Sequence, residues 1–302
     1  MTEPAAMVTG LRGVDLGVPD VAAHARFYTG VWNLAVAAER GESVYLRGSG
    51  AYHHIVALHP RQQPALLRLD LAAADRAAVE TLHRRVAGMG VAATAPAAVD
   101  EPGGGYAFSF ADPEGRVLRV IAGDQRHADA ALVPDRPHKI THVVFNSPRQ
   151  EEAARFWVEA LGFSVSDRSL LTFIRCNSDH HSIAFHPGER ASLHHIAFEM
   201  ADIDSVMRGA GRMRDAGHPI EWGLGRHGPG NNVFAYFVGP DDFVIEYTAE
   251  IEQVTDASPV RTPRDWAYPP GHSDLWGVTP PPSERMKAAQ KKIGFAEGVF
   301  RP

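Results

Sequence analysis

The chain has 302 residues, 22% of them charged, with a formal net charge of −6 and a pI of about 6.2. This negative net charge does not provide the positive electrostatic field that a nucleic-acid-binding protein needs. No apolar run approaches the ~20 residues that a membrane-spanning helix needs. The one cysteine, Cys176, excludes an internal disulfide framework and a cysteine-based metal cluster. Residues 1–4 do not resemble the start of a signal peptide, so we expect a cytoplasmic protein that contacts neither nucleic acid nor membrane.

The first half of the chain is predicted to hold two units, at residues 8–60 and 63–123. Each unit is expected to contain a strand, a helix and three further strands. A polar linker with a proline follows at residues 125–137.

The third unit, at residues 138–188, begins with an apolar run at residues 140–145. Ser147 is predicted to be the N-cap of the next helix, with Pro148 in the first helical position and Gln150 completing a capping box. Gly162 is predicted to end this helix, because glycine favours the conformation found just beyond a helix end.

The fourth unit spans residues 191–250 and repeats the same order. Its helix is predicted to start near Asp204 and to stop before Gly217, and the β-rich runs 233–238 and 243–248 follow. Beyond residue 254 the chain is rich in proline, which indicates an extended tail with one short helix near 283–292. Such a tail would act as packing or linker, or it would cover the mouth of a cavity.

The chain repeats itself. Residues 140–145 align with 11–16 at an offset of 129 (142 − 13), and residues 193–196 align with 66–69 at an offset of 127 (195 − 68). The repeat predicts an α+β protein in which four units pair into two homologous domains, at residues 1–125 and 138–250, with a tail at 251–302.

Potential metal ligands occur only in the second copy, at His142, His195 and Glu246. Their counterparts in the first copy are Gly13, Arg68 and Arg119. Because strand residues alternate between faces, all three would project toward one cavity if the sheets curl around it. Two neutral imidazoles and one carboxylate suit Fe(II) and leave coordination positions open.

Each residue has an ordinary alternative interpretation. A histidine in a strand is more often a surface or hydrogen-bonded residue, and Glu246 would be unremarkable on an edge strand that faces water. The three together favour a metal site, because both histidines hold equivalent repeat positions and all three ligands are missing from the first copy.

These motifs resemble the vicinal oxygen chelate superfamily and, within it, the type I extradiol catechol dioxygenases. The resemblance covers about residues 8–250 and is most specific in four segments: Asp179-His180-His181-Ser182, Leu193-His194-His195-Ile196, residues 225–232 and residues 243–247. It implies four βαβββ modules whose curved mixed sheets surround a cavity in each domain.

The resemblance also implies residue roles. It assigns Fe(II), with Mn(II) as another possible ion, to His142, His195 and Glu246. His181 corresponds to the histidine that exchanges protons with substrate or oxygen, and His227 and Tyr236 correspond to groups that orient the bound oxygens. His180 and His194 are expected to point the other way and to be structural.

The implied activity is ring cleavage of a catechol beside its diol, with both atoms of O2 inserted, in the degradation of aromatic compounds. Phe173 and Trp222 are predicted to line the substrate pocket, which favours an uncharged, alkyl- or aryl-substituted catechol. Family members are commonly oligomeric, so we expect a homo-oligomer.

Two other functions remain open at this point. A metal-dependent isomerase or lyase of the glyoxalase type would need a further carboxylate ligand and no acid–base histidine at position 181. A non-catalytic protein that binds a small aromatic compound would need no metal at all.

Overall fold

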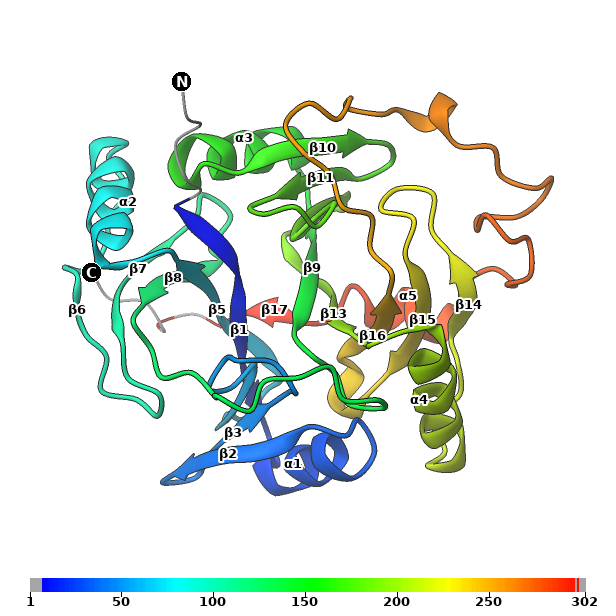
Figure 1. The fold of residues 1–302 in the computed structure, drawn as a ribbon, viewed down its shortest axis with the longest axis horizontal. Helices are drawn as coiled ribbons and strands as arrows, with labels where there is room; N and C mark the ends of the chain where they lie inside the picture. The colour runs from blue at the N-terminus through cyan, green and yellow to red at the C-terminus, as the bar shows by residue number, and fades with distance from the viewer. Residues whose placement is uncertain (1–6, 297, 299–302) are drawn as a thin grey trace.

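The computed structural model describes residues 7–296 and residue 298. Residues 1–6, which include the start that was predicted not to be a signal peptide, lie outside the described part, as do residues 297 and 299–302 of the tail. Within the described ranges the chain forms two large sheets with helices packed on them (Figure 1). No helix in these ranges is long and apolar enough to cross a membrane.

The first sheet comes from the first half of the chain and from the end of the tail. Its elements are β1 (Val8–Val18), α1 (Val21–Gly30), β2 (Ala35–Arg40), β3 (Ser43–Arg47), β4 (Val56–Pro60), β5 (Ala65–Ala73), α2 (Arg76–Gly88), β6 (Ala97–Ala98), β7 (Tyr106–Ala111), β8 (Val117–Ala122) and β17 (Gly294–Phe295). The strands lie in the order β2-β3-β4-β1-β5-β8-β7-β6, and β17 pairs with β5.

The second sheet repeats this arrangement. Its elements are β9 (Ile140–Ser147), α3 (Gln150–Leu161), β10 (Ser164–Arg168), β11 (Thr172–Arg175), β12 (Ile183–Pro187), β13 (Ser192–Glu199), α4 (Ile203–Asp215), β14 (Trp222–Arg226), β15 (Val233–Val238), η1 (Pro240–Asp242) and β16 (Val244–Ala249). The order β10-β11-β12-β9-β13-β16-β15-β14 matches the first sheet strand for strand. The predicted α+β architecture of four strand–helix–three-strand units is confirmed.

The two units of each sheet meet along their first strands. In the second sheet β9 and β13 pair antiparallel, while β12 runs parallel to β9 and β16 runs parallel to β13. The three strands β9, β13 and β16 are therefore adjacent at the centre of the sheet, where a residue is enclosed on both sides.

One face of each sheet supplies the core. Val143, Phe145, Ile196 and Tyr247 belong to a single apolar cluster that runs through both halves of the molecule. At the contact between the halves, the Trp32 ring stacks on Tyr247 with centroids 3.6 Å apart. The opposite face of the second sheet is consequently free to carry polar side chains.

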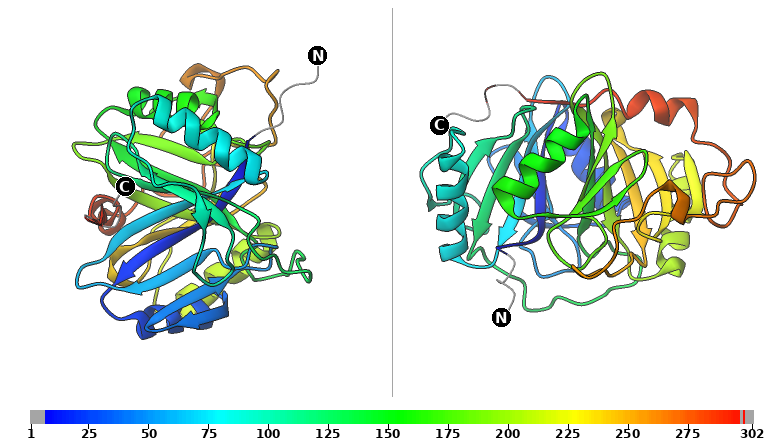
Figure 2. Two further views of the ribbon diagram at one scale, coloured as in Figure 1. Left: turned by 90° about the vertical axis from the view of Figure 1, so that its left-hand side faces the viewer. Right: turned by 90° about the horizontal axis from the view of Figure 1, so that it is seen from above.

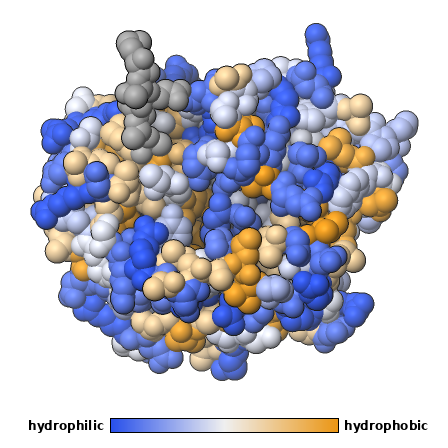
Figure 3. All heavy atoms as spheres, in the orientation of Figure 1, coloured by the Kyte–Doolittle hydropathy of each residue, from blue (hydrophilic) through white to orange (hydrophobic). Residues whose placement is uncertain are grey.

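The tail passes around the second sheet before it returns to the first. It contains η2 (Pro263–Asp265) and α5 (Glu284–Ala289), and β17 is the last strand in its described part (Figure 2). The face shown in Figure 3 is mainly hydrophilic, with small apolar patches scattered over it. The predicted domain boundaries at residues 125, 138 and 251 stay a prediction.

The start of α3 differs from the prediction. Its N-cap is Arg149, whose side chain makes no capping hydrogen bond, and the helix begins at Gln150. Ser147 belongs instead to β9, where it pairs with Pro187 of β12. The capping box was wrong because sheet pairing extends β9 through the residue that would otherwise cap the helix.

Candidate metal centre and its cavity

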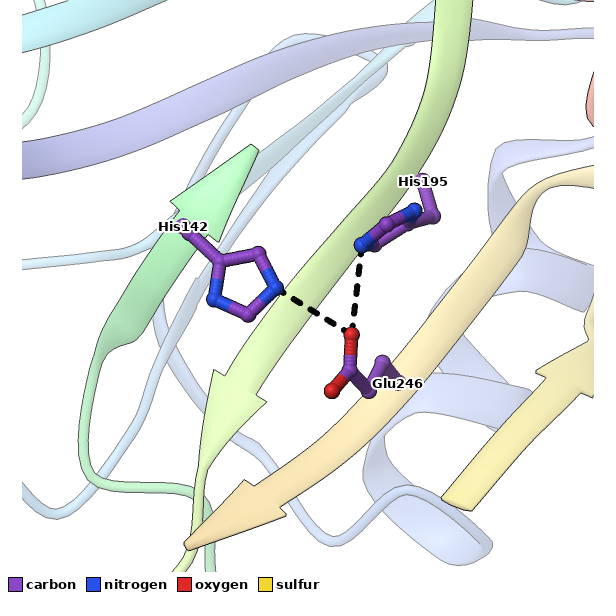
Figure 4. Close-up of side chains that lie close together, drawn as sticks. All are labelled: His142, His195 and Glu246. Atoms are coloured by element: carbon purple, nitrogen blue, oxygen red, sulfur yellow. Dashed lines mark hydrogen bonds and ion pairs between the residues drawn. The ribbon is translucent and has the colours of Figure 1, made fainter. Parts of the chain in front are cut away.

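Three central strands of the second sheet each contribute one potential metal ligand: His142 from β9, His195 from β13 and Glu246 from β16 (Figure 4). One ligand atom from each residue lies within 4.8 Å of the others. His142 Nε2 and His195 Nε2 each lie 3.2 Å from Glu246 Oε2. The structure thus brings the predicted triad together.

Strand register explains this convergence. Ala197 of β13 pairs with His142 on one side and with Glu246 on the other. His195 lies two residues before Ala197, and strand residues two apart share a face. The core-facing neighbours Val143 and Ile245 point to the opposite face, as predicted.

The charge states of the triad suit a divalent cation. Burial raises the pKa of Glu246, but the adjacent His142 and His195 imidazoles outweigh burial and hold the pKa well below its usual value. Burial lowers the pKa of His195. The set therefore presents an ionised carboxylate beside an uncharged His195 imidazole, which are the protonation states that metal ligands need.

His195 also carries an unpaired ring nitrogen. Its Nε2 is buried and has no hydrogen-bond partner, although Glu246 Oε2 lies 3.2 Å away. A buried polar atom without a partner is costly unless something else binds it. Two histidines and a carboxylate, with the His195 Nε2 nitrogen unpaired beside the carboxylate, fit Fe(II) or Mn(II) with open coordination positions.

The three other predicted site residues lie around the triad. The His181 ring centroid is 4.2 Å from that of His142. His227 Nε2 lies 3.0 Å from the Tyr236 hydroxyl and 4.0 Å from Glu246 Oε1. The site therefore contains a histidine on one side of the triad and a histidine–tyrosine pair on the other.

Burial sets the protonation of these neighbours. It lowers the pKa of His181 well below the ordinary value, with a further decrease from His142, and it lowers the pKa of His227 to about 4. Burial and then Glu246 raise the pKa of Tyr236 well above 10. At neutral pH His181 is therefore uncharged and has one ring nitrogen with a free lone pair, while the Tyr236 hydroxyl remains a donor.

A cavity of about 720 Å³ opens beside the triad. Its walls include Phe173 and Trp222, as predicted, together with Val144 and Leu171. The Trp222 ring stacks on Tyr236 with centroids 5.1 Å apart. The polar groups of the site thus face a space that is bounded largely by apolar side chains.

The tail forms part of the wall of this cavity. Trp266, Tyr268 and Met286 line it, and Met286 also packs on Tyr236 of the sheet. Sequence reasoning missed these side chains, and their only signal was the presence of aromatic residues in a proline-rich segment.

His194 differs from the prediction, whereas His180 agrees with it. His194 lines the cavity beside His195, because a β-bulge between Leu193 and His195 interrupts the alternation of β13. His180 is fully buried against Asp167. The simple alternation of strand residues therefore failed at His194.

Comparison with known proteins gives matches over both halves. Residues 139–247 match the model of the Glyoxalase/Bleomycin resistance protein/Dioxygenase superfamily, and residues 13–121 match a glyoxalase-like domain. A Mn(II)-bound glyoxalase from Novosphingobium aromaticivorans is 37% identical, with a TM-score of 0.85, over 93% of this chain and 94% of that one.

Other relatives are more distant. Metapyrocatechase 2 of Cupriavidus necator is 32% identical over 169 residues, which cover 48% of this chain and 53% of that protein. The homoprotocatechuate 2,3-dioxygenase of Brevibacterium fuscum shares the fold, with a TM-score of 0.82 and 21% identity over 94% of each chain. The chain spans about half the length of the curated relatives that it matches most strongly.

Proposed function

The chain belongs to the Glyoxalase/Bleomycin resistance protein/Dioxygenase superfamily, and from this premise we propose that it is an extradiol dioxygenase that cleaves a catechol with O2. The observation that carries the proposal is the triad of His142, His195 and Glu246 beside a cavity that also exposes His181 and Tyr236. This combination offers a metal with open positions, a proton acceptor and a hydrogen-bond donor in one enclosed space.

The triad would hold Fe(II), with Mn(II) as the other candidate ion. The chemistry that such an ion supplies when bound is chelation of the two diol oxygens and transfer of electron density from the ring to O2. The donor set supports Fe(II), and the Mn(II)-bound relative supports Mn(II) as the other candidate ion.

The protein's own residues would manage protons and orientation. His181, which is uncharged at neutral pH, would accept the proton of one substrate hydroxyl. The Tyr236 hydroxyl and His227 would hold the substrate oxygens by hydrogen bonds. The apolar walls at Val144 and Phe173 would exclude water and thereby strengthen these contacts.

An uncharged catechol with an alkyl or aryl substituent is the proposed substrate class. A cavity of about 720 Å³ is larger than a single ring requires, and Leu171, Trp266 and Met286 offer apolar contacts to a substituent. The homo-oligomer and the cytoplasmic location stay predictions.

Oxygen uptake tests the proposal directly. Protein reconstituted anaerobically with Fe(II), and separately with Mn(II), would be mixed with simple, alkyl and aryl catechols in an oxygen electrode cell. We expect one O2 consumed per catechol and a yellow ring-cleaved product. No uptake across the panel with either ion would refute the activity.

A glyoxalase-type isomerase or lyase is the second candidate, because the Mn(II)-bound relative carries that name. Among the residues that the structure describes, no second carboxylate joins the triad, which favours the dioxygenase. Substitution of His181 by alanine separates the two candidates, since it should abolish ring cleavage while leaving an isomerase largely active.

A further inference from the structure

Behind His181 a chain of buried hydrogen bonds leads away from the cavity. His180 Nδ1 lies 3.0 Å from His181 Nδ1, and His180 Nε2 lies 2.5 Å from Asp167 Oδ2. The side chains of His180 and Asp167 are at most 1% exposed, so solvent does not compete for these contacts. None of the roles assigned above uses Asp167.

Asp167 is itself held by the tail. The Arg261 backbone N–H donates to Asp167 Oδ1 at 2.8 Å, and the Arg261 guanidinium lies 2.9 Å from Oδ2. Arg261 also bonds Glu252 at 2.6 Å, which fixes the guanidinium from the other side. Burial opposes ionisation of Asp167, but hydrogen bonds from His180 and Arg261 lower its pKa, so the group is a carboxylate that only accepts.

With His180 uncharged, these contacts determine where the protons lie. A carboxylate requires the His180 Nε2 to carry a hydrogen, so an uncharged His180 leaves its Nδ1 as an acceptor. His181 Nδ1 must then donate, which leaves His181 Nε2 unprotonated. Packing keeps the ring in place, because the Phe173 ring lies 5.0 Å away and a Cβ at Gly230 would come within 3.1 Å of His181 Cε1.

The first half of the molecule has the histidine pair without the carboxylate. His53 Nδ1 lies 3.0 Å from His54 Nδ1, as in the second half. The strand that carries Asp167 has a bulge just before this residue, and the equivalent strand of the first half has the same bulge. The residue after that bulge is Ala38, which pairs with Tyr45 as Asp167 pairs with Phe173. The carboxylate therefore occurs only in the half that carries the triad.

We infer that Asp167 is a positioning residue which, through His180, fixes His181 in the tautomer whose Nε2 accepts the substrate proton. This inference rests on the dioxygenase function proposed above. Asp167→Asn should reverse the chain of donors. The amide oxygen would stay with Arg261 and the amide N–H would face His180, so His181 would carry its hydrogen on Nε2 and could not act as the base.

Nitrogen NMR of the imidazoles tests the tautomer without any turnover. The full chain labelled with [15N]histidine would be measured in the metal-free form, and the His181 signals would be assigned by their loss in His181→Asn. We expect Nδ1–H for His181 in the wild type and Nε2–H in Asp167→Asn. An Nε2–H tautomer in the wild type, or an unchanged tautomer in Asp167→Asn, would overturn the inference.

Kinetics provide the second measurement. In Asp167→Asn we expect kcat for catechol cleavage to fall by ~10²-fold or more with little change in KM, which is the size of a general-base contribution. Asp179→Asn is the matched control, because Asp179 precedes His180 but its carboxylate bonds only Lys139 and Gln253 among the described side chains. The control should keep both kcat and the tautomer, and an equal loss in the two variants would contradict the role of Asp167.

The two measurements also separate this inference from the proposed function. If no catechol is turned over, the proposed function fails. The His181 tautomer measured in the wild type still tests the role of Asp167. If Asp167→Asn does not fold, the wild-type spectrum alone decides.

Discussion

The two halves of the molecule place different chemistry on the same scaffold. Their sheets have the same strand order, and Arg119 pairs with Ser109 as Glu246 pairs with Tyr236. Arg68 takes the place of His195, opposite Asp15 in the neighbouring strand. Equivalent strand positions thus carry arginine in one half and potential metal ligands in the other.

In the first half the buried charges neutralise one another. Arg68 lies 2.7 Å from Asp15, 2.9 Å from Asp70 and 3.0 Å from Glu101. Arg119 pairs with Asp70 and lies 2.6 Å from Glu101. The comparison teaches that the fold tolerates buried polar groups at these positions, as paired ions in the first half and as a cluster of two histidines and a carboxylate beside a cavity in the second.

The largest expected difference between the halves is metal binding. His195→Gln should lose the bound metal and all measurable oxygen uptake, because a metal ligand is removed and even residues that only support ligands affect metal affinity by ~10- to 100-fold. Metal analysis of the purified, reconstituted protein measures the effect. His59→Gln is the matched control in the first half, beside Asp15, and should keep full occupancy. If His195→Gln retained its metal, metal binding would no longer distinguish the second half from the first.

A substitution in the ion cluster of the first half should instead reduce stability and leave metal binding unchanged. Arg119→Met leaves Asp70 and Glu101 short of a buried partner, so we expect the free energy of unfolding to fall by ~3–5 kcal/mol. Metal content per folded chain should not change. Urea unfolding measures the loss, and Arg40→Met, which breaks an exposed pair with Asp100, should show none. Equal stability of Arg119→Met and the wild type would mean that the Arg119 ion pairs do not stabilise the fold.

Tyr236 and Ser109 offer a finer test of the comparison. Tyr236→Phe removes the hydroxyl that bonds His227, and we expect kcat to fall about tenfold, the equivalent of one hydrogen bond of ~1.4 kcal/mol. Ser109→Ala at the equivalent position should leave kcat unchanged. Steady-state oxygen uptake decides, and a Tyr236→Phe variant with wild-type kcat would exclude the hydroxyl from the reaction.

The last expected effect is a gradual change of stability with pH, and it concerns the first half alone. Burial, followed by Arg12, lowers the pKa of His54 to about 2 from an ordinary value of 6.5. Below pH 6.5 the unfolded chain therefore binds a proton that the folded chain refuses, and the free energy of unfolding falls with decreasing pH by up to ~1.4 kcal/mol per pH unit. Urea midpoints of metal-free protein between pH 7.5 and 5 should decline more steeply for the wild type than for His54→Gln. Parallel curves would contradict the low pKa.

Much of this arrangement could be predicted from the sequence because it follows from repetition and alternation. The offset between the halves identified His142, His195 and Glu246 without any knowledge of contacts. The faces of Val143 and Ile245 followed from the period of a strand. The same reasoning indicated four equivalent units, since each repeated run was followed by a helix pattern.

The remainder depended on contacts that no local pattern reveals. The bulge that turns His194 toward the cavity is a property of pairing between β9 and β13. Asp167 meets Arg261 across 94 residues of sequence, and neither residue carries a local signal of that contact. Ser147 was assigned to a helix cap because sheet pairing with β12 was not visible from its neighbours.

Pulsed electron paramagnetic resonance of the Mn(II)-loaded protein tests the central claim most directly. We expect one ion per chain with nuclear couplings from two imidazole nitrogens, and we expect one of these couplings to vanish in His142→Gln. A Mn(II) ion bound without nitrogen ligands, or a chain that binds no ion, would contradict a metal centre built from the second half of the molecule.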